Sequence, residues 1–510
     1  MPRFILIALL LIPACGGESE DPPQNRMLIL TTDTLLSAAS EYALYRESAD
    51  FEVELCSTAD LEVTTTLQDA VRERVKDFHE NSPADQEQYL LIIADALSSD
   101  PENPEFVPAT RGPENEWGDT PYADFDGDAI PEVPIGRLPF REPATVRMYL
   151  DRVRDYETVV PVGEFNKIMR AYAGEGGFGP EIDGALEMVA GWIFDEMSYD
   201  FDLFMTYAAS TSNYYLPYAE WDAEYNQRYQ DGAVLIPYIG HTLGQVTCCQ
   251  QGPPARRAML TFFSCSDGTY HVADEVGCLA EDVLVRAEGP VAAMGATTVS
   301  HPYGNAVLPR ELGHAIIDLH EPTYGKALNT AKYNAVHRHD SMRETIDATM
   351  RSFSDEDLDY LITTHLTMYN LLGDPAVPLH LPEGRVRFDS PDSITRGETI
   401  TVEGRVWSDA KRAPMKNGEL LVTLEVQRSF IINDLTPRDP DNHDPETCKN
   451  NHQLANNKIA ASATTTVDNE TFVIELTVPP DLPLEAEYYL KGYASTATGD
   501  AMGSKKVLMK

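Results

Sequence analysis

Short apolar runs alternate with amphipathic segments up to about residue 380 of the chain. Runs of this length are typical of strands that are buried on both faces of a sheet. They predict strands at residues 27–32, 52–55, 88–95, 234–240, 258–264 and 290–295. Apolar residues at helical spacing predict helices at residues 35–46, 67–80, 146–159, 275–286 and 310–319. The alternation predicts an α/β fold around a mostly parallel sheet, with its site beyond the carboxyl ends of the strands.

The pattern changes after residue 380, where short segments alternate between apolar and polar positions. They predict strands at residues 386–388, 399–406, 419–427, 458–467, 471–478 and 487–493. Turn signals such as Asn417-Gly418 separate them, and residues 431–457 read as one long polar loop. With no helix expected there, residues 381–510 are predicted to form a β-sandwich of immunoglobulin type.

The first residues read as an export signal. An apolar run follows Arg3, but it is too short to cross a bilayer and suits the core of a signal peptide. Cys15 directly follows a small residue at the end of this run, which resembles a bacterial lipoprotein signal. The resemblance implies cleavage after residues 1–14, lipid on the Cys15 thiol, and a polar tether over residues 15–26. The alternative is an ordinary secretory signal with an incidental cysteine.

Composition narrows the possible partners of this chain. It has 510 residues, of which 43% are hydrophobic, and this share excludes global disorder. The formal charge of −43 argues against a nucleic-acid partner, because binding phosphate backbones requires basic patches. Seven cysteines are too few for a disulfide scaffold of this length. We therefore expect several domains with ordinary cores, and contact with a membrane only through the N-terminal lipid.

Two chemically reactive side chains follow predicted strands. His241 comes directly after the run 234–240, and Cys265 directly after the run 258–264. Residues at neighbouring strand ends of a parallel sheet can lie side by side, and an imidazole beside a thiolate is a base beside a nucleophile. From the residues alone, Cys265 could also be a buried core thiol or half of a disulfide.

Several separate motifs occur in a fixed order along the chain. They are residues 122–128 (YADFDGD), 131–139 (PEVPIGRLP), 173–177 (AGEGG), 238–241 (YIGH), 264–268 (SCSDG) and 371–375 (LLGDP). Together they resemble the gingipain-type cysteine peptidases, which are relatives of caspases and legumains. The resemblance covers about residues 27–380. It implies a caspase-like core in two subdomains, 27–165 and 166–380, followed by an immunoglobulin-like domain.

The resemblance also implies residue roles. Cys265 would be the nucleophile, His241 the acid and base, and Glu175 the group that orients His241. The main-chain N–H groups of Thr242 and Cys265 would hold the oxyanion, and no cofactor would be required. The family usually has Gly where this chain has Thr242, so an impaired peptidase or a non-enzymatic surface lipoprotein on the same fold is the alternative. Glu175 could also be a plain surface carboxylate.

The side-chain preference of such a peptidase is left open by the sequence. Relatives that cleave after Arg or Lys have an acidic residue in the pocket. Here an ungapped match places Leu186 at that position, between acidic neighbours. The candidate pocket residues are Glu181, Asp183, Leu186 and Glu187.

Two further clusters have several interpretations. Asp124, Asp126 and Asp128 are spaced like oxygen ligands for structural calcium, although the EF-hand pattern fails; the alternative is a solvated acidic loop. The neighbours Cys248 and Cys249 could form a vicinal disulfide, remain free, or pair with Cys56 and Cys278. Because vicinal disulfides are rare, we expect a structural role or pairing elsewhere.

Overall fold

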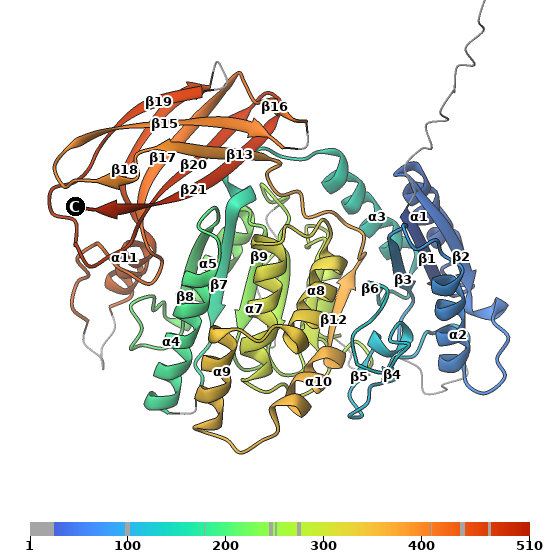
Figure 1. Ribbon diagram of the computed structural model, residues 1–510. Coiled ribbons are helices and arrows are strands. Elements are labelled where there is room, and N and C mark those ends of the chain that lie inside the picture. The colour runs from blue at the N-terminus through green and yellow to red at the C-terminus, as the bar shows by residue number, and fades with distance from the viewer. Residues whose placement is uncertain are drawn as a thin grey trace, which may run out of the picture.

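Ten strands form one continuous sheet in this computed structural model (Figure 1). The order is β2 (Phe51–Ser57), β1 (Asn25–Thr31), β3 (Gln88–Ile93), β6 (Ile135–Leu138), β12 (Tyr369–Gly373), β11 (Ala292–Ala296), β10 (Met259–Phe263), β9 (Leu235–Ile239), β7 (Ile168–Ala173) and β8 (Asp202–Tyr207). All neighbours are parallel except β11 and β12. The predicted α/β fold is confirmed, with a mixed sheet. In this spatial order, the predicted subdomain 27–165 supplies the first four strands and the predicted subdomain 166–380 the last six. The boundary between residues 165 and 166 stays a prediction.

The structure describes residues 25–96, 103–177, 179–243, 248–249, 252–272, 277–409, 411–438, 444–467 and 471–510. In the helix that begins at Pro180, the side chains of residues 180–182 and 185 are also outside the description. The expected signal peptide, Cys15 and the tether up to residue 24 lie outside the described residues. Asn25 and Arg26, which we expected in the tether, begin β1, because both pair with residues of β2. Among the described helices, none has the length and apolar character needed to cross a bilayer.

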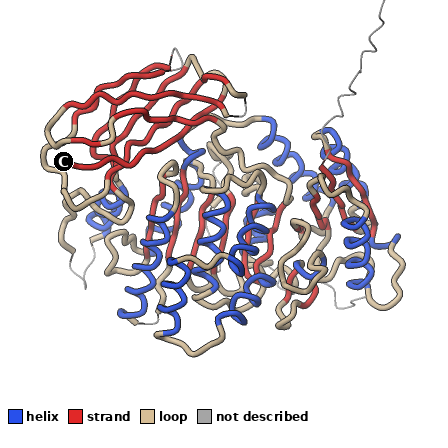
Figure 2. Tube along the Cα trace, in the orientation of Figure 1, coloured by secondary structure: helices blue, strands red, loops and turns tan. Residues whose placement is uncertain are grey.

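Helices pack around this sheet, alternating with its strands (Figure 2). They are α1 (Leu36–Ser48), α2 (Leu67–Glu80), α3 (Pro143–Thr158), α4 (Pro180–Glu196), α5 (Tyr218–Asp231), α6 (Leu279–Val285), α7 (Gly304–Ile317), α8 (Tyr324–His337), α9 (Ser341–Arg351) and α10 (Leu358–Met368). Side-chain caps fix the starts of α2, α8 and α9, where Thr66, Thr323 and Asp340 accept main-chain N–H groups. A short hairpin, β4 (Thr110–Arg111) with β5 (Trp117–Gly118), lies between β3 and β6 in the chain.

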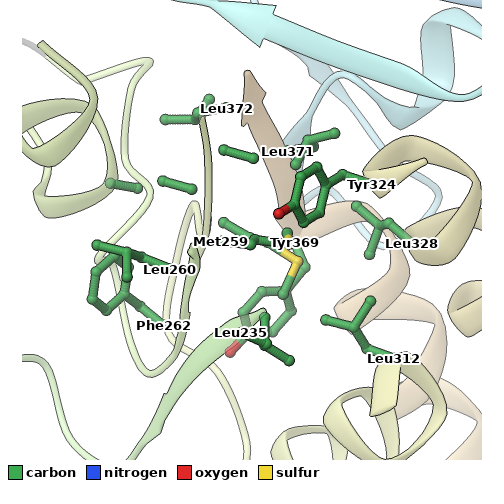
Figure 3. Close-up of a cluster of buried hydrophobic side chains, with 14 of the residues drawn as sticks. Leu235, Met259, Leu260, Phe262, Leu312, Tyr324, Leu328, Tyr369, Leu371 and Leu372 are labelled. Carbon is green, nitrogen blue, oxygen red and sulfur yellow. The ribbon is translucent and has the colours of Figure 1, made fainter. Parts of the chain in front are cut away.

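The centre of the sheet is held by a large buried cluster, part of which is drawn in Figure 3. Leu235 of β9 and Met259 of β10 are buried in the same cluster as Leu312 of α7 and Leu328 of α8. Full burial of a side chain of this size contributes about 1.5–3 kcal/mol to stability. The cluster therefore holds β9 and β10 firmly just before the positions where His241 and Cys265 leave the sheet.

Two of the sequence motifs meet inside the fold and have a structural role. A side chain at Gly136 would overlap the main-chain oxygen of Gly373, so the two segments can approach only without one. Asp374, the next residue, is fully buried and accepts hydrogen bonds from Tyr42 (2.6 Å) and from Nε of Arg46 (2.7 Å). The motif thus ties the end of β12 to helix α1.

The chain after residue 380 forms a second unit of strands with its own core. Its strands are β13 (Gly384–Ser390), β14 (Ser393–Ile394), β15 (Thr399–Ser408), β16 (Ala413–Pro414), β17 (Gly418–Val426), β18 (Ile459–Val467), β19 (Thr471–Thr477), β20 (Tyr488–Thr496) and β21 (Gly499–Met509). In β15 and β19 buried and exposed residues alternate, which is typical of strands with one face on a core. This unit fits a β-sandwich, and its immunoglobulin type stays a prediction.

One expectation for this region is wrong, because residues 431–457 do not form only a loop. They contain helix α11 (Pro445–Asn456), whose start is capped by the Asp444 carboxylate. The helix buries Cys448 and Ala455. Its last residue, Asn456, accepts a hydrogen bond from the main-chain N–H of Met205 in β8 (2.8 Å) and donates one to the Met205 carbonyl (2.8 Å). The contact with the ten-stranded sheet therefore stabilises a helix that the polar local sequence does not indicate.

Candidate active site

Three neighbouring parallel strands end in register at the candidate active site. Ala173 of β7 pairs with Ile239 of β9, and Ile239 pairs with Phe263 of β10. Each strand is followed two residues later by one of the predicted catalytic side chains. Glu175, His241 and Cys265 therefore leave adjacent strands at the same level, with His241 on the middle strand.

His241 is held in one tautomer by the main chain. Its Nε2 lies 2.8 Å from the carbonyl oxygen of Gly176, and since a carbonyl can only accept, Nε2 must carry the proton. In the neutral ring the lone pair is then on Nδ1. The acceptor for Nε2 is thus the residue after Glu175, and the exposed Glu175 lies beside it.

Cys265 is partly exposed, and the residues around it fix the position of its loop. Its Sγ lies 3.6 Å from the carbonyl of Ser300 and 3.8 Å from Ser300 Oγ. The Thr242 hydroxyl donates to the carbonyl of Cys265 at 2.6 Å. Thr242 therefore links the loop of His241 to the loop of Cys265.

Two supporting residues were missed by the sequence reasoning. Asn305 of α7 donates to Ser300 Oγ (2.8 Å) and to the Phe263 carbonyl (3.2 Å). Asp267 is buried and accepts hydrogen bonds from Ser264 Oγ and from the main-chain N–H of Leu243 (3.1 Å). Asp267 lies inside the motif 264–268, so its place in that motif could have marked it as a site residue. Nothing in the sequence around Asn305 marks that residue. Both fix the loops that present His241 and Cys265.

The main-chain N–H groups named for the oxyanion are free in the described structure. Neither Thr242 N–H nor Cys265 N–H donates to an acceptor among the described residues, whereas the next N–H along each loop does. Ser266 N–H donates to Thr298, and Leu243 N–H to Asp267. N–H groups that have no acceptor among the described residues are able to donate hydrogen bonds to a developing negative charge.

A cavity of about 380 Å³ opens at these three strand ends. Glu175, His241 and Cys265 contribute to its wall. Most of the rest is apolar and comes from the sheet and from helices α4 and α7. The apolar lining includes Met169, Leu186, Val189, Ile193, Phe194, Met197, Leu235, Pro237, Ala306 and Leu312.

The predicted pocket residues Asp183, Leu186 and Glu187 line this same cavity. The side chain of Glu181 is outside the described residues. Glu187 is half-buried, its carboxylate accepts from the Ser212 hydroxyl at 2.6 Å, and burial raises its pKa. The carboxyl group is therefore disposed toward its neutral form inside a mainly apolar cavity.

The acidic loop also brings its three carboxylates together. One oxygen each from Asp124, Asp126 and Asp128 lies within 4.8 Å of the others. The carboxylate of Asp124 already accepts the N–H groups of Gly127 (2.7 Å) and Ala129 (3.0 Å). Asp128 accepts from Ile130, so main-chain donors stabilise this loop in part.

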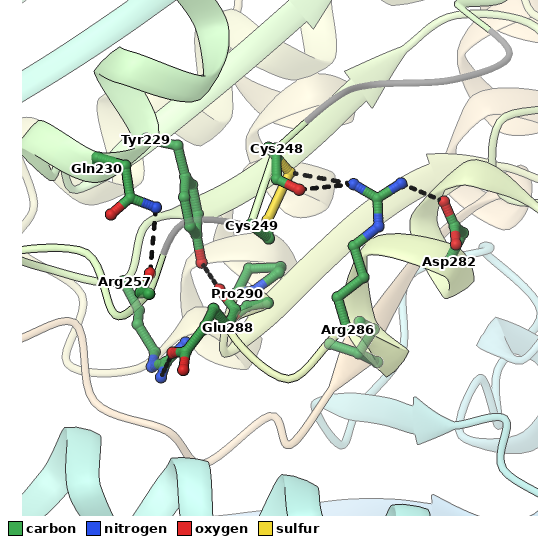
Figure 4. Close-up of a disulfide and its surroundings, with 12 residues drawn as sticks. Tyr229, Gln230, Cys248, Cys249, Arg257, Asp282, Arg286, Glu288 and Pro290 are labelled. Carbon is green, nitrogen blue, oxygen red and sulfur yellow. Dashed lines mark hydrogen bonds and ion pairs between the residues drawn. A yellow bond between two sulfur atoms is a disulfide. The ribbon is translucent and has the colours of Figure 1, made fainter.

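Cys248 and Cys249 form a vicinal disulfide, and our expectation of pairing elsewhere is wrong (Figure 4). Arg286 donates to the carbonyl of Cys248 at 2.8 Å and pairs with Asp282 at 2.6 Å. Cys56, Cys265, Cys278 and Cys448 are free thiols. Cys278 and Cys448 are buried, and burial raises the pKa of Cys278 to about 12. Among these four thiols, Cys265 is the one that lines the active-site cavity.

This fold, with a thiol and an imidazole at neighbouring strand ends, defines a cysteine peptidase of gingipain-like architecture. The family model of Peptidase family C25 matches residues 20–380, and the chain belongs to this family. No curated protein matches the chain.

Solved structures agree with this fold. The crystal structure of the Arg-specific cysteine proteinase gingipain R (RgpB) is 15% identical, with a TM-score of 0.51 over 96% of this chain and 99% of that chain. The complex of Porphyromonas gingivalis RgpB pro- and mature domains is 14% identical, with a TM-score of 0.51 over 95% of this chain and 100% of that chain. At such identities the likeness concerns the fold alone.

Proposed function

We propose that this chain is an exported endopeptidase that cleaves peptide bonds through Cys265 and His241, with Glu175 in support. The observation that carries the proposal is the register of β7, β9 and β10. Because these strands end at the same level, the three side chains line one cavity. Hydrolysis of peptides by a Cys265→Ala variant tests it.

In the first step, the Cys265 thiolate attacks the peptide carbonyl carbon, and the carbonyl π electrons move to oxygen. The N–H groups of Thr242 and Cys265 would donate to this oxyanion. His241 takes the thiol proton and gives it to the leaving amine, so the C–N bond breaks and a thioester forms.

In the second step, water replaces the amine. His241 removes a proton from water as the oxygen attacks the thioester carbonyl, and the same proton returns to sulfur when the C–S bond breaks. The bond from Nε2 to the Gly176 carbonyl keeps Nδ1 available for both transfers. Glu175 would stabilise the imidazolium through its negative charge.

The lining of the cavity supports a preference for a large apolar side chain before the scissile bond. Its walls from α4 and α7 are mainly apolar. In the relatives that cleave after Arg or Lys an acidic residue stands in the pocket, and the matching position in this chain is Leu186. A guanidinium or ammonium group would lose water in this mainly apolar cavity, which costs several kcal/mol unless a carboxylate compensates. Of the carboxylates in its wall, Glu187 already accepts a hydrogen bond from Ser212, and burial raises its pKa.

A panel of fluorogenic peptides that differ only in this side chain measures the preference. We expect kcat/KM for Phe or Leu to exceed that for Arg by about 10–100-fold. Leu186→Asp should reduce this ratio by supplying a carboxylate, and the matched Leu186→Asn should not. Fastest cleavage after Arg by the original protein, lost in Glu187→Gln, would instead assign Glu187 as the counter-ion. Flat cleavage of all peptides would contradict a selective pocket.

We further propose that the mature chain begins at Cys15 and is anchored by lipid outside the cytoplasm. The short apolar run, the small residue before Cys15 and the polar segment after it support this. Mass spectrometry of the N-terminal peptide from bacterial membranes should find an acylated Cys15. A Cys15→Ser variant should lack the acyl mass and leave the membrane fraction. An unmodified Cys15 in the mature protein would contradict the anchor.

A structural calcium ion at Asp124, Asp126 and Asp128 is the remaining proposal for a bound group. The chemistry would not require it, and its support is the approach of three carboxylates. We expect calcium to raise the Tm by a few degrees relative to chelator, and Asp126→Asn to remove the response. Asp151→Asn, at an exposed site on α3, should respond like the original protein. An equal Tm in calcium and chelator would exclude the ion.

A further inference from the structure

A second cavity, of about 330 Å³, lies where the peptidase sheet meets the C-terminal strands. Arg170 of β7 lines it, whereas the neighbouring residues Met169 and Ala171 line the active-site cavity, and Tyr172 contributes to both walls. The two cavities are therefore on opposite faces of β7. Helix α5, strand β17 and helix α11 supply other parts of the wall, and Figure 1 shows α11 beside β8.

The lining of this junction cavity is rich in positive charge, in contrast to the chain as a whole. Five basic side chains face three carboxylates, in a protein of formal charge −43. They are Arg170, Arg228, Arg428, Lys458 and Lys491, against Asp202, Glu224 and Glu425.

Each of the three carboxylates already has a cationic partner. Asp202 pairs with Lys167 (2.9 Å) and with Lys491. Glu425 pairs with Lys491 at 3.1 Å, and Glu224 with Arg228 at 2.6 Å. None of the three is therefore left over to neutralise Arg170.

The other buried cations are satisfied by carbonyl and hydroxyl oxygens. Arg428 donates to the carbonyls of Phe194 (2.6 Å) and Met197 (2.7 Å). Lys458 donates to the Tyr214 hydroxyl (2.9 Å) and the Phe430 carbonyl (2.8 Å).

Arg170 is different, because its guanidinium group has no polar partner among the described residues. It is only 5% exposed, and its buried Nε and Nη1 atoms make no hydrogen bond. Its guanidinium carbon lies 5.0 Å from the centre of the Phe204 ring. Burial, and then the positive charge of Arg228, lower the pKa of Arg170. Arg228 itself uses Nε and Nη1 for Glu224 and Asp231, and its Nη2 makes no hydrogen bond to described residues.

We propose that the junction cavity binds a small oxyanion, with a phosphate, sulfate or carboxylate group held by Arg170 and Arg228. A buried guanidinium without an acceptor is costly, and an oxyanion supplies the paired oxygens that its fork of donors matches. A water molecule occupies about 30 Å³, so the cavity has room for such an ion with several waters or for a small organic acid. Residues of the C-terminal unit close the cavity, so the ion stabilises the docking of the two units.

The experiment measures the Tm and calorimetric binding of the full mature protein with sodium phosphate, sodium sulfate or sodium acetate, against sodium chloride at equal ionic strength. We expect a saturable rise in Tm with at least one oxyanion and none with chloride. Comparing the three salts separates tetrahedral ions from carboxylates. The measurement is made on Cys265→Ala protein, so its outcome is independent of peptidase activity.

Variants then locate the site. Arg170→Met should weaken binding of the ion at least tenfold and leave the Tm in chloride equal or higher, since it removes an unpaired buried charge. The Arg170→Lys variant should bind the ion with an affinity between those of the original protein and the Arg170→Met variant. Arg387→Met removes the same charge from an exposed strand of the C-terminal unit and should bind normally. Equal responses to all salts, or unchanged binding in folded Arg170→Met protein, would overturn the proposal.

Discussion

Replacing Cys265 with alanine is expected to abolish peptide hydrolysis, lowering kcat/KM by about 10⁴-fold or more. The thiol is the nucleophile in the proposed mechanism, and among the described residues that line the cavity it is the only cysteine. Its side chain contacts Ser300 but supports little packing, so the Tm should change little. Initial rates on a cleaved fluorogenic peptide, together with a thermal melt, make the measurement.

The control for this variant is another free thiol far from the cavity. Cys56→Ala removes a partly buried cysteine on β2, the edge strand far from β10, and this variant should retain activity. Iodoacetamide should modify Cys265 before buried Cys278 and Cys448, and the lost activity should follow the extent of that adduct. Full activity in folded Cys265→Ala protein would favour a different nucleophile, while no activity in the original protein would favour a binding role.

Strands buried on both faces were predictable from the sequence because no charged residue interrupts them. The apolar runs at residues 88–95, 234–240 and 258–264 correspond to β3, β9 and β10. Strand β8 was not predicted, because Asp202 faces the junction cavity and breaks the apolar pattern. Helix α4 was missed for a related reason: it is apolar on several sides, and Met188 and Trp192 are exposed, so it lacks a clear polar face.

The residues of the candidate site likewise fall into those that the sequence predicted and those that it did not. Glu175, His241 and Cys265 were found because each follows a strand within a recognisable motif. Asn305 and Ser300 could not be found, because their roles depend on where α7 packs against β10 rather than on local spacing. The role of Arg170 was even less predictable from the sequence. Only the packing of the C-terminal unit buries its guanidinium group, and only the structure shows that this group lacks a polar partner among the described residues.

The buried pair between Asp374 and Arg46 should have the largest effect on stability. Asp374 is fully buried and binds Arg46 through Nε at 2.7 Å and Nη2 at 2.6 Å, while its other oxygen accepts from the N–H of Ala376. Asp374→Ala leaves the Arg46 charge buried with Glu157 as its remaining partner. We expect the free energy of unfolding to fall by about 3–5 kcal/mol, measured by urea denaturation.

Two further variants show whether the loss of stability comes from the unpaired charge of Arg46 or only from the lost contact. The double variant Arg46→Met/Asp374→Ala removes both charges, so it should recover part of the lost stability although it deletes more polar atoms. Glu41→Ala breaks a solvent-exposed pair between Glu41 of α1 and Arg147 of α3, and it should lower the stability far less than Asp374→Ala does. If Asp374→Ala costs no more than Glu41→Ala, the LLGDP motif does not hold β12 to α1 through this carboxylate. If the double variant is less stable than Asp374→Ala, Arg46 contributes by its contacts rather than as an unpaired charge.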